Sequence, residues 1–108
     1  MAYNLSKKIV LSNFSKIINQ SKPVLVDFFA SWCGPCKAMS PILDQVKDEL
    51  KETVVILKID VDKNQKLAAK LQVRGVPTLV IYKNGAIVWR ESGVVPKQTI
   101  IQKLKEFM

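Results

Sequence analysis

The sequence predicts a single α/β domain in which a central, mixed β-sheet is flanked by helices on both faces. Helix-like and strand-like apolar patterns alternate along the chain, which is typical of this class. Residues 23–29 are apolar on both alternating faces, as a strand covered by helices on two sides requires. Asn84 and Gly85 separate two later apolar runs and predict an antiparallel hairpin. The length of 108 residues allows one domain, which we assign to residues 1–108.

The first part of the chain is predicted to alternate between helix and strand. Ser12 is placed to cap a short helix, and residues 23–29 form a buried strand after it. A loop follows over residues 30–35. From residue 36 to about residue 50 the apolar side chains have helical spacing. Pro41 lies inside this stretch and should kink the helix, because proline removes an amide donor.

The second part continues the same alternation and ends in a hairpin and a helix. Residues 54–61 are rich in β-branched side chains and predict a second buried strand. Asp62 or Asn64 is placed to cap a short helix that ends near residue 71. The remaining elements are the two hairpin strands and the last helix, over residues 77–82, 86–91 and 96–107. A βαβ unit followed by a hairpin gives a sheet with both parallel and antiparallel strands.

The composition indicates an ordinary globular protein. Hydrophobic residues make up 48% of the chain and charged residues 24%. No apolar run approaches the ~20 residues that a membrane-spanning helix needs. Residues 1–8 lack the apolar core of a secretory signal. We therefore expect a cytoplasmic protein with no membrane partner.

The net charge is strongly positive. Seventeen basic residues against nine acidic ones give +8, which raises nucleic acid, anionic membranes and acidic proteins as partners. Only Arg74 and Arg90 are arginines, and the lysines are scattered, with no block of five like charges. A solvated, lysine-rich surface is therefore favoured over nucleic-acid binding, and we expect no nucleic-acid partner.

The chain has two cysteines and no histidine, which restricts its chemistry. A Ser-His-Asp triad and a Cys/His catalytic pair both need a histidine. A zinc site within one chain needs four ligands drawn mostly from cysteine and histidine. We therefore expect no bound metal. The chemistry that remains open belongs to Cys33 and Cys36.

Cys33 and Cys36 lie directly after a predicted buried strand, where a helix begins. The unpaired amide groups and the positive dipole end of a helix N-terminus stabilise a thiolate. We expect Cys33 to lie at the exposed leading edge as the nucleophile, with Cys36 about one turn further on. Gly34 lets the chain turn tightly, and Pro35 suits the first helical turn.

Two other interpretations of the cysteine pair stay open. A stabilising Cys33–Cys36 bridge would close so short a ring that its loop-entropy gain is at most about 2 kcal/mol. Such a bridge would also not persist in a reducing cytosol. Half of a metal site is the other alternative. Because a C-x-x-C motif near a βαβ pattern is typical of redox proteins, we favour redox function.

The segment VDFFASWCGPCK at residues 26–37 resembles the active-site segment of the thioredoxin family. Further matches follow in register along essentially the whole chain, at Pro41, residues 58–62, residues 73–78, residues 82–85 and Gly93. The resemblance implies the thioredoxin fold and a thiol-disulfide oxidoreductase that reduces disulfides in client proteins. It also implies recycling by a thioredoxin reductase that uses NADPH, with no cofactor bound by the chain itself. We expect the chain to be a monomer.

Asp27 lies in the middle of the predicted strand, on the same face as Leu25 and Phe29. Burial should raise the pKa of its carboxyl group. We expect Asp27 to accept and return the Cys36 proton, and a buried aspartate of the thioredoxin family matches it. A capping aspartate at a strand end is the alternative. Lys58 in the next strand is placed to pair with Asp27, or else to extend from a strand end toward water.

The Val76–Pro77 bond is the second site feature. In the thioredoxin family the matching bond is cis and lies against the cysteines, and the resemblance implies the same here. The Val76 backbone would then pair with an extended client segment. A proline that merely begins a strand is the alternative. The expected client-binding residues are Trp32, Gly34, Pro35, Gly75, Val76, Pro77 and Gly93.

Two positions depart from the family pattern. Phe29 stands where a tryptophan is usual, and Gln65 stands where a proline is common. Neither touches the thiol chemistry. Two rival functions also remain. One is an oxidant or isomerase built on the same fold, which the Gly34 and Pro35 pair and the missing export signal disfavour. The other is a binding module that does not use its cysteines.

Overall fold

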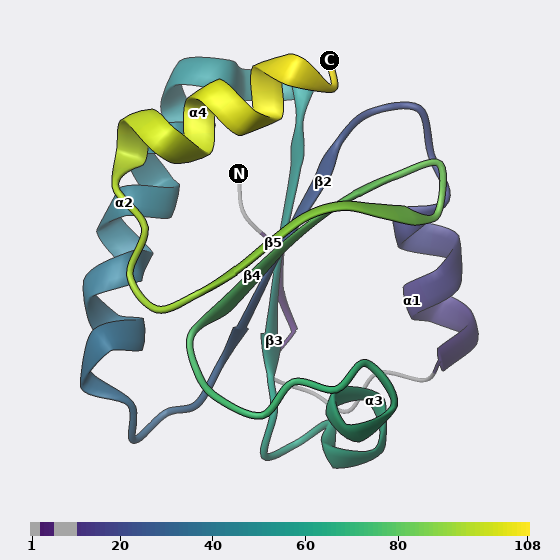
Figure 1. The fold of residues 1–108 in the computed structure, drawn as a ribbon, viewed down its shortest axis with the longest axis vertical. Coiled ribbons are helices and arrows are strands. Elements are labelled where there is room, and N and C mark those ends of the chain that lie inside the picture. Colours follow the sequence, from purple (N-terminus) through teal and green to yellow (C-terminus); the bar gives the residue numbers. More distant parts are fainter. Residues whose placement is uncertain (1–2, 6–10) are drawn as a thin grey trace.

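The computed structural model describes residues 3–5 and 11–108, and a five-stranded sheet forms its centre (Figure 1). The strand order is β1-β3-β2-β4-β5. Strands β1 and β2 both run parallel to β3, whereas β4 runs antiparallel to β2 and β5. The predicted mixed sheet is therefore confirmed. The strands are β1 (Tyr3–Leu5), β2 (Val24–Phe29), β3 (Val55–Asp60), β4 (Thr78–Lys83) and β5 (Ala86–Ser92).

Helices cover both faces of this sheet. Helices α2 and α4 pack on one face, and α1 and α3 lie on the other (Figure 1). The helices are α1 (Leu11–Ile18), α2 (Gly34–Leu50), α3 (Gln65–Lys70) and α4 (Lys97–Glu106), with a 3-10 turn η1 (Lys51–Thr53) after α2. None of the helices in the described part of the chain is long and apolar enough to cross a membrane.

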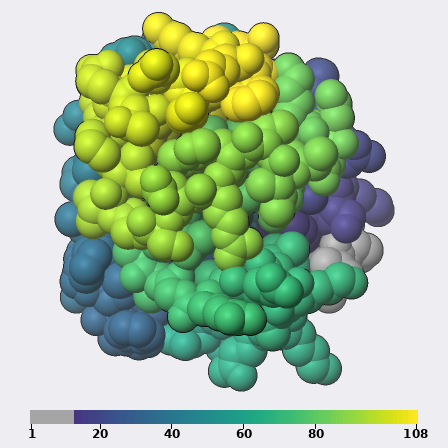
Figure 2. Space-filling model, in the orientation of Figure 1, coloured from purple at the N-terminus to yellow at the C-terminus, as the bar shows by residue number. Residues whose placement is uncertain are grey.

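Each face of the sheet has its own apolar core. Between the sheet and helices α2 and α4 the core includes Leu25, Met39, Leu43, Ile56, Leu79 and Ile100. On the opposite face it includes Phe14, Val26, Phe28, Ile59, Leu67 and Val80. Alternate residues of β2 supply both cores, because side chains along a strand point to opposite faces. On the side shown in Figure 2, atoms of β5 and α4 cover the upper part of the molecule and atoms of the α3 region cover the lower part. Strand β2 is the middle strand of the sheet.

All predicted helices and strands are present, with shifted ends. The hairpin is confirmed, since Asn84 and Gly85 both have positive φ (52° and 83°), as a tight two-residue turn requires. Helix α1 begins at Leu11, so Ser12 lies inside it and is not its cap. The N-cap of α3 is Asn64, not Asp62. Strand β1 at the sheet edge was not predicted, because three residues are too few to show a period.

Helix α2 differs most from its prediction, and it matters most for the site. It begins at Gly34, two residues before the predicted start, because Pro35 fits the first helical turn, where an amide proton is not needed. The helix then continues through Pro41 to Leu50 without interruption. Its N-terminus follows the carboxyl end of β2 after a short loop of residues 30–33.

Candidate active site

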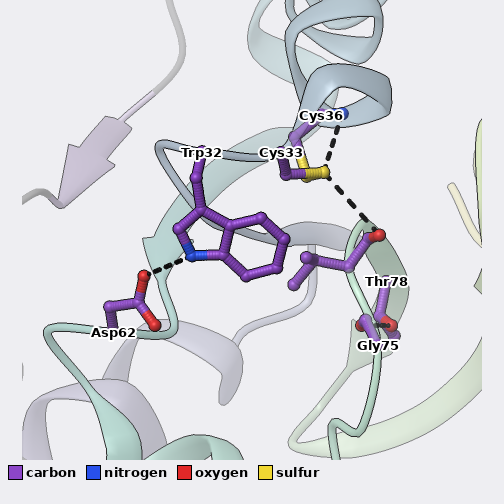
Figure 3. The surroundings of a disulfide bond; sticks show 7 residues. Trp32, Cys33, Cys36, Asp62, Gly75 and Thr78 are labelled. Atoms are coloured by element: carbon purple, nitrogen blue, oxygen red, sulfur yellow. Dashed lines mark hydrogen bonds between the residues drawn. A yellow bond between two sulfur atoms is a disulfide. The ribbon is translucent and has the colours of Figure 1, made fainter.

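Cys33 is the N-cap residue of α2. Its backbone is extended (φ −86°, ψ 112°), and the Cys36 amide donates a hydrogen bond to Cys33 Sγ at 3.1 Å. The two cysteines form a disulfide, with their Cα atoms 5.3 Å apart (Figure 3). An amide that points at a sulfur also stabilises the thiolate form of that sulfur. The helix N-terminus therefore favours negative charge on Cys33.

The expected exposure of Cys33 is wrong. Cys33 is 4% exposed and Cys36 is 5% exposed. Both pack with Ala30 and against the side chains of Phe29 and Val76, so the loop preceding α2 and the loop preceding β4 cover them. Exposure does not distinguish the two sulfurs in the disulfide form. Their positions relative to the helix N-terminus distinguish them, since Cys33 Sγ is the sulfur that accepts the N-cap hydrogen bond.

The loop that precedes β4 lies against the disulfide. The Val76–Pro77 peptide bond is cis, as the resemblance implied. Cys33 Sγ lies 3.7 Å from the Val76 carbonyl oxygen, within reach of a weak S–H···O bond when the thiol carries a proton (Figure 3). Thr78 Oγ1 donates to the Gly75 carbonyl at 2.6 Å and closes the loop. Sequence patterns assigned Thr78 no role in the site. Its polar side chain, directly after Pro77 and before an apolar strand, could have indicated one.

Trp32 lies beside the cysteines and is 71% exposed, in agreement with its predicted place in an open loop. Its indole Nε1 donates to Asp62 Oδ2 at 2.9 Å, which fixes the ring (Figure 3). Asp62 follows β3, and its sequence position predicted a possible helix cap within the family-like segment 58–62, but no contact with Trp32. The indole is thus a flat, apolar surface held in place next to the sulfurs.

Of the three glycines near the site, only Gly93 has a backbone conformation that favours glycine. Gly93 has φ +90° and its amide donates to the Pro77 carbonyl at 2.9 Å, so its backbone conformation favours glycine. A Cβ added at Gly75 or Gly93 would meet nothing within 4 Å, so the space beside both is open. Gly34 has no positive φ and equally open space, so the predicted tight turn does not require its glycine.

Asp27 lies on the α2 face of β2 and is only 1% exposed. Burial raises the pKa of its carboxyl group to about 6, and the positive charge of Lys58 opposes that rise. Its Oδ1 has no hydrogen-bond partner among the described residues. A capping role is therefore wrong for Asp27, because it is buried in mid-strand.

A cavity of about 150 Å³ lies between Asp27 and Cys36, and both residues line it. A single water molecule needs only ~10–15 Å³ of such space. Exposed Ser31 and Lys37 also border the cavity, so it reaches the surface. The buried and half-buried side chains that line the cavity include Asp27, Phe29, Cys36, Ser40 and Lys58.

Lys58 is adjacent to Asp27 but does not form the predicted direct pair. The two residues are register partners in the parallel strands β2 and β3. Lys58 Nζ donates instead to Ser40 Oγ at 3.0 Å. Among residues 11–108 no ion pair within 4.0 Å joins Lys58 to Asp27, so its charge acts on the carboxyl group from a greater distance. Ser40 was missed, since its partner lies 18 residues away in the sequence.

The chemistry of this arrangement is thiol-disulfide exchange. Two cysteines at a helix N-terminus, joined in a disulfide and backed by a buried carboxyl group, can be reduced and oxidised reversibly. No group of three or more potential metal-ligating side chains occurs within the described ranges. The fold and the site thus define a thiol-disulfide oxidoreductase.

Comparisons with known proteins agree with this class. The Thioredoxin family model matches residues 6–106. A thioredoxin-like protein of Synechocystis is 43% identical over 105 residues, which are 96% of this chain and all of that protein. Thioredoxin Y2, chloroplastic, of Arabidopsis thaliana is 39% identical, and 93% of this chain matches 60% of its length. This chain therefore belongs to the thioredoxin family.

Two further matches bear on structure and on domain partners. A mutant thioredoxin from Halobacterium salinarum NRC-1 superposes with a TM-score of 0.84 at 30% identity, covering 97% of this chain and 90% of that one. A bifunctional thioredoxin reductase/thioredoxin of Mycobacterium leprae is 37% identical over 95 residues, which are 88% of this chain and 21% of that protein. The thioredoxin fold predicted from the sequence is confirmed.

Proposed function

We propose that this chain reduces disulfides in client proteins and that Cys33 is the attacking nucleophile. The Cys33 thiolate attacks one sulfur of the client disulfide, a mixed disulfide forms, and the other client sulfur leaves as a thiolate. The observation that carries this assignment is the hydrogen bond from the Cys36 amide to Cys33 Sγ at 3.1 Å. A donor that points at Cys33 Sγ supports negative charge on this sulfur.

Cys36 then resolves the mixed disulfide. Its thiolate attacks Cys33 Sγ, the bond between the two cysteines forms, and the bond from Cys33 to the client breaks. The client sulfur leaves with the electron pair. Over both steps the client gains two electrons and two protons, and the chain is left with the Cys33–Cys36 disulfide.

Asp27 serves the second step as the proton acceptor for Cys36. A thiol must lose its proton before it attacks, and a carboxyl group with a pKa of about 6 is mostly ionised near neutral pH. The cavity between Asp27 and Cys36 supports transfer through water. Lys58 contributes its positive charge near the carboxylate.

The client binds across the rim of the site. Exposed Trp32 offers an apolar contact next to the sulfurs, and the loop of Val76 and Pro77 offers backbone groups to an extended segment. Open space beside Gly75 and Gly93 supports close approach of a second backbone. Exposed Gly34 and Pro35 complete the rim on the α2 side.

A thioredoxin reductase is the proposed source of electrons. The fusion of both activities in the Mycobacterium leprae relative supports such a partner. NADPH then acts only through that partner, and this chain binds no cofactor of its own. We further propose that residues 1–108 act as one monomeric domain in the cytoplasm, since an electron carrier of this kind needs a reducing compartment.

Reduction of a model protein disulfide tests the proposal. With dithiothreitol as the electron source, the chain is expected to accelerate reduction at least roughly tenfold over dithiothreitol alone, because a stabilised thiolate attacks faster at neutral pH. The Cys33→Ser/Cys36→Ser double variant is the control and should add nothing. No acceleration by the intact dithiol form would contradict the proposal. Cellular activity retained by the double variant would instead support a binding module.

A further inference from the structure

We propose that Ser40 is a positioning residue for the second step: its hydroxyl holds the Lys58 ammonium at the cavity that separates Asp27 from Cys36. This inference rests on the proposed role of Asp27 as the proton acceptor. Nothing in the thiol chemistry itself requires a serine at this position. The position of Ser40 on the wall of the cavity, within hydrogen-bond distance of Lys58, suggests its role.

Ser40 occupies the right place to link the resolving cysteine with Lys58. It lies four residues after Cys36 on α2, so both side chains project from the same face of the helix, one turn apart. Both border the cavity of about 150 Å³. Lys58 reaches the cavity from β3, where it is the register partner of Asp27, and donates to Ser40 Oγ at 3.0 Å.

Without the hydrogen bond to Ser40, we expect the Lys58 ammonium to move away from the cavity toward water. A lysine side chain is flexible and its ammonium is strongly hydrated, so a half-buried lysine extends toward water when no acceptor holds it. Lys58 is half-buried, and the cavity reaches the surface. The hydroxyl of Ser40 is the acceptor that α2 supplies on the cavity wall.

Lys58 is the principal charge that acts on Asp27. The other ionisable groups nearby are Cys36 and exposed Lys37 from α2, and Asp60, which shares the Lys58 face of β3. Asp60 is engaged with the Asp62 amide. Strand β4 places an apolar residue, Leu79, opposite Asp27. The position of the Lys58 ammonium therefore decides how strongly its positive charge opposes the rise in the Asp27 pKa that burial causes.

The proton step explains why this position matters. In resolution the Cys36 Sγ–H proton passes through water to the Asp27 carboxylate, and the resulting thiolate displaces the client sulfur from Cys33. Asp27 accepts a proton only while it is ionised. A cation held at the cavity keeps the carboxyl group ionised at neutral pH despite its burial. Ser40 thus acts through Lys58 and touches no reacting atom.

Titration of the Asp27 carboxyl carbon by NMR tests the inference in the oxidised protein, without any client. Ser40→Ala should raise the pKa of Asp27 by about half a pH unit, a fraction of the effect of a full neighbouring charge. Alanine favours the helix, so the variant should fold. Ser40→Thr keeps a hydroxyl and should restore the wild-type value. Ser31→Ala, in the same cavity but without a bond to Lys58, is the matched control.

Kinetics separate this inference from the function on which it rests. In single-turnover release of the reduced client, the pH midpoint in Ser40→Ala should move upward with the Asp27 pKa, while the first attack keeps its rate. No upward shift in Ser40→Ala, or an equal shift in Ser31→Ala, would overturn the role of Ser40. If Asp27→Asn leaves the pH profile of release unchanged, the proton-acceptor role itself is wrong, and the NMR titration still decides whether Ser40 positions Lys58.

Discussion

A Cys36→Ser variant mixed with a disulfide-containing client will accumulate a covalent mixed disulfide through Cys33. The first attack remains possible because Cys33 keeps its place at the N-terminus of α2, whereas the resolving thiol is gone. Catalytic turnover should fall to the level without protein. Electrophoresis without reductant and mass spectrometry of the cross-linked peptide measure the trapped complex.

The reciprocal variant makes this test decisive. Cys33→Ser should trap no client and should also lose turnover. The two cysteine residues are almost equally buried in the disulfide form, at 4% and 5% exposure, so accessibility alone predicts no difference between the variants. The hydrogen bond to Cys33 Sγ, in contrast, predicts a large difference in trapping between the two variants. Equal trapping through Cys36 would contradict the assignment of the nucleophile.

Asp27 should make the folded protein less stable at neutral pH than in mild acid. Its folded-state pKa of about 6 lies above its ordinary value of 3.8, so the folded state holds the proton more tightly. The contribution of Asp27 to the free energy of unfolding should therefore be highest below pH 4, fall as the pH rises to about 6, and then level off. One pKa unit is worth about 1.36 kcal/mol, so the loss from Asp27 is about 3 kcal/mol.

Asp27→Asn should remove this loss, since an amide does not titrate. Urea unfolding of both proteins at pH 4 and pH 7.5 measures the difference between the two pH values within each protein, and this cancels any packing cost of the amide. The same variant should slow release of the reduced client roughly tenfold or more and leave the first attack nearly unchanged. Equal pH dependence in both proteins, or equal rate losses in both steps, would contradict the account of Asp27.

Sequence patterns predicted those parts of the fold that depend on neighbouring residues in the chain, such as strand β2 and the hairpin turn. Residues of β2 are apolar on both faces because two helical layers cover them, and this pattern is visible in seven residues of sequence. The Asn84 and Gly85 turn needs only two residues with positive φ. The three residues of β1 are too few to show a period, and they are recognised as a strand by their parallel pairing with β3.

The site was predictable where chemistry resides in a motif and not where it depends on contacts between distant segments. Cys33 and Cys36 lie within one motif, and a mid-strand Asp27 is conspicuous among apolar neighbours. The bonds from Lys58 to Ser40 and from Trp32 to Asp62 join residues 18 and 30 positions apart. The burial of Cys33 likewise results from the loop before β4, which no local pattern places there.

The ionisation of Cys33 in the reduced protein is the most direct measurement of the central assignment. In Cys36→Ser, which leaves one thiol, the rate of alkylation against pH gives the midpoint at which that thiol becomes a thiolate. The helix N-terminus predicts a midpoint well below the ~8.5 of a free cysteine. A midpoint at or above ~8.5 would mean that the helix does not activate this sulfur, and the proposed nucleophile would be wrong.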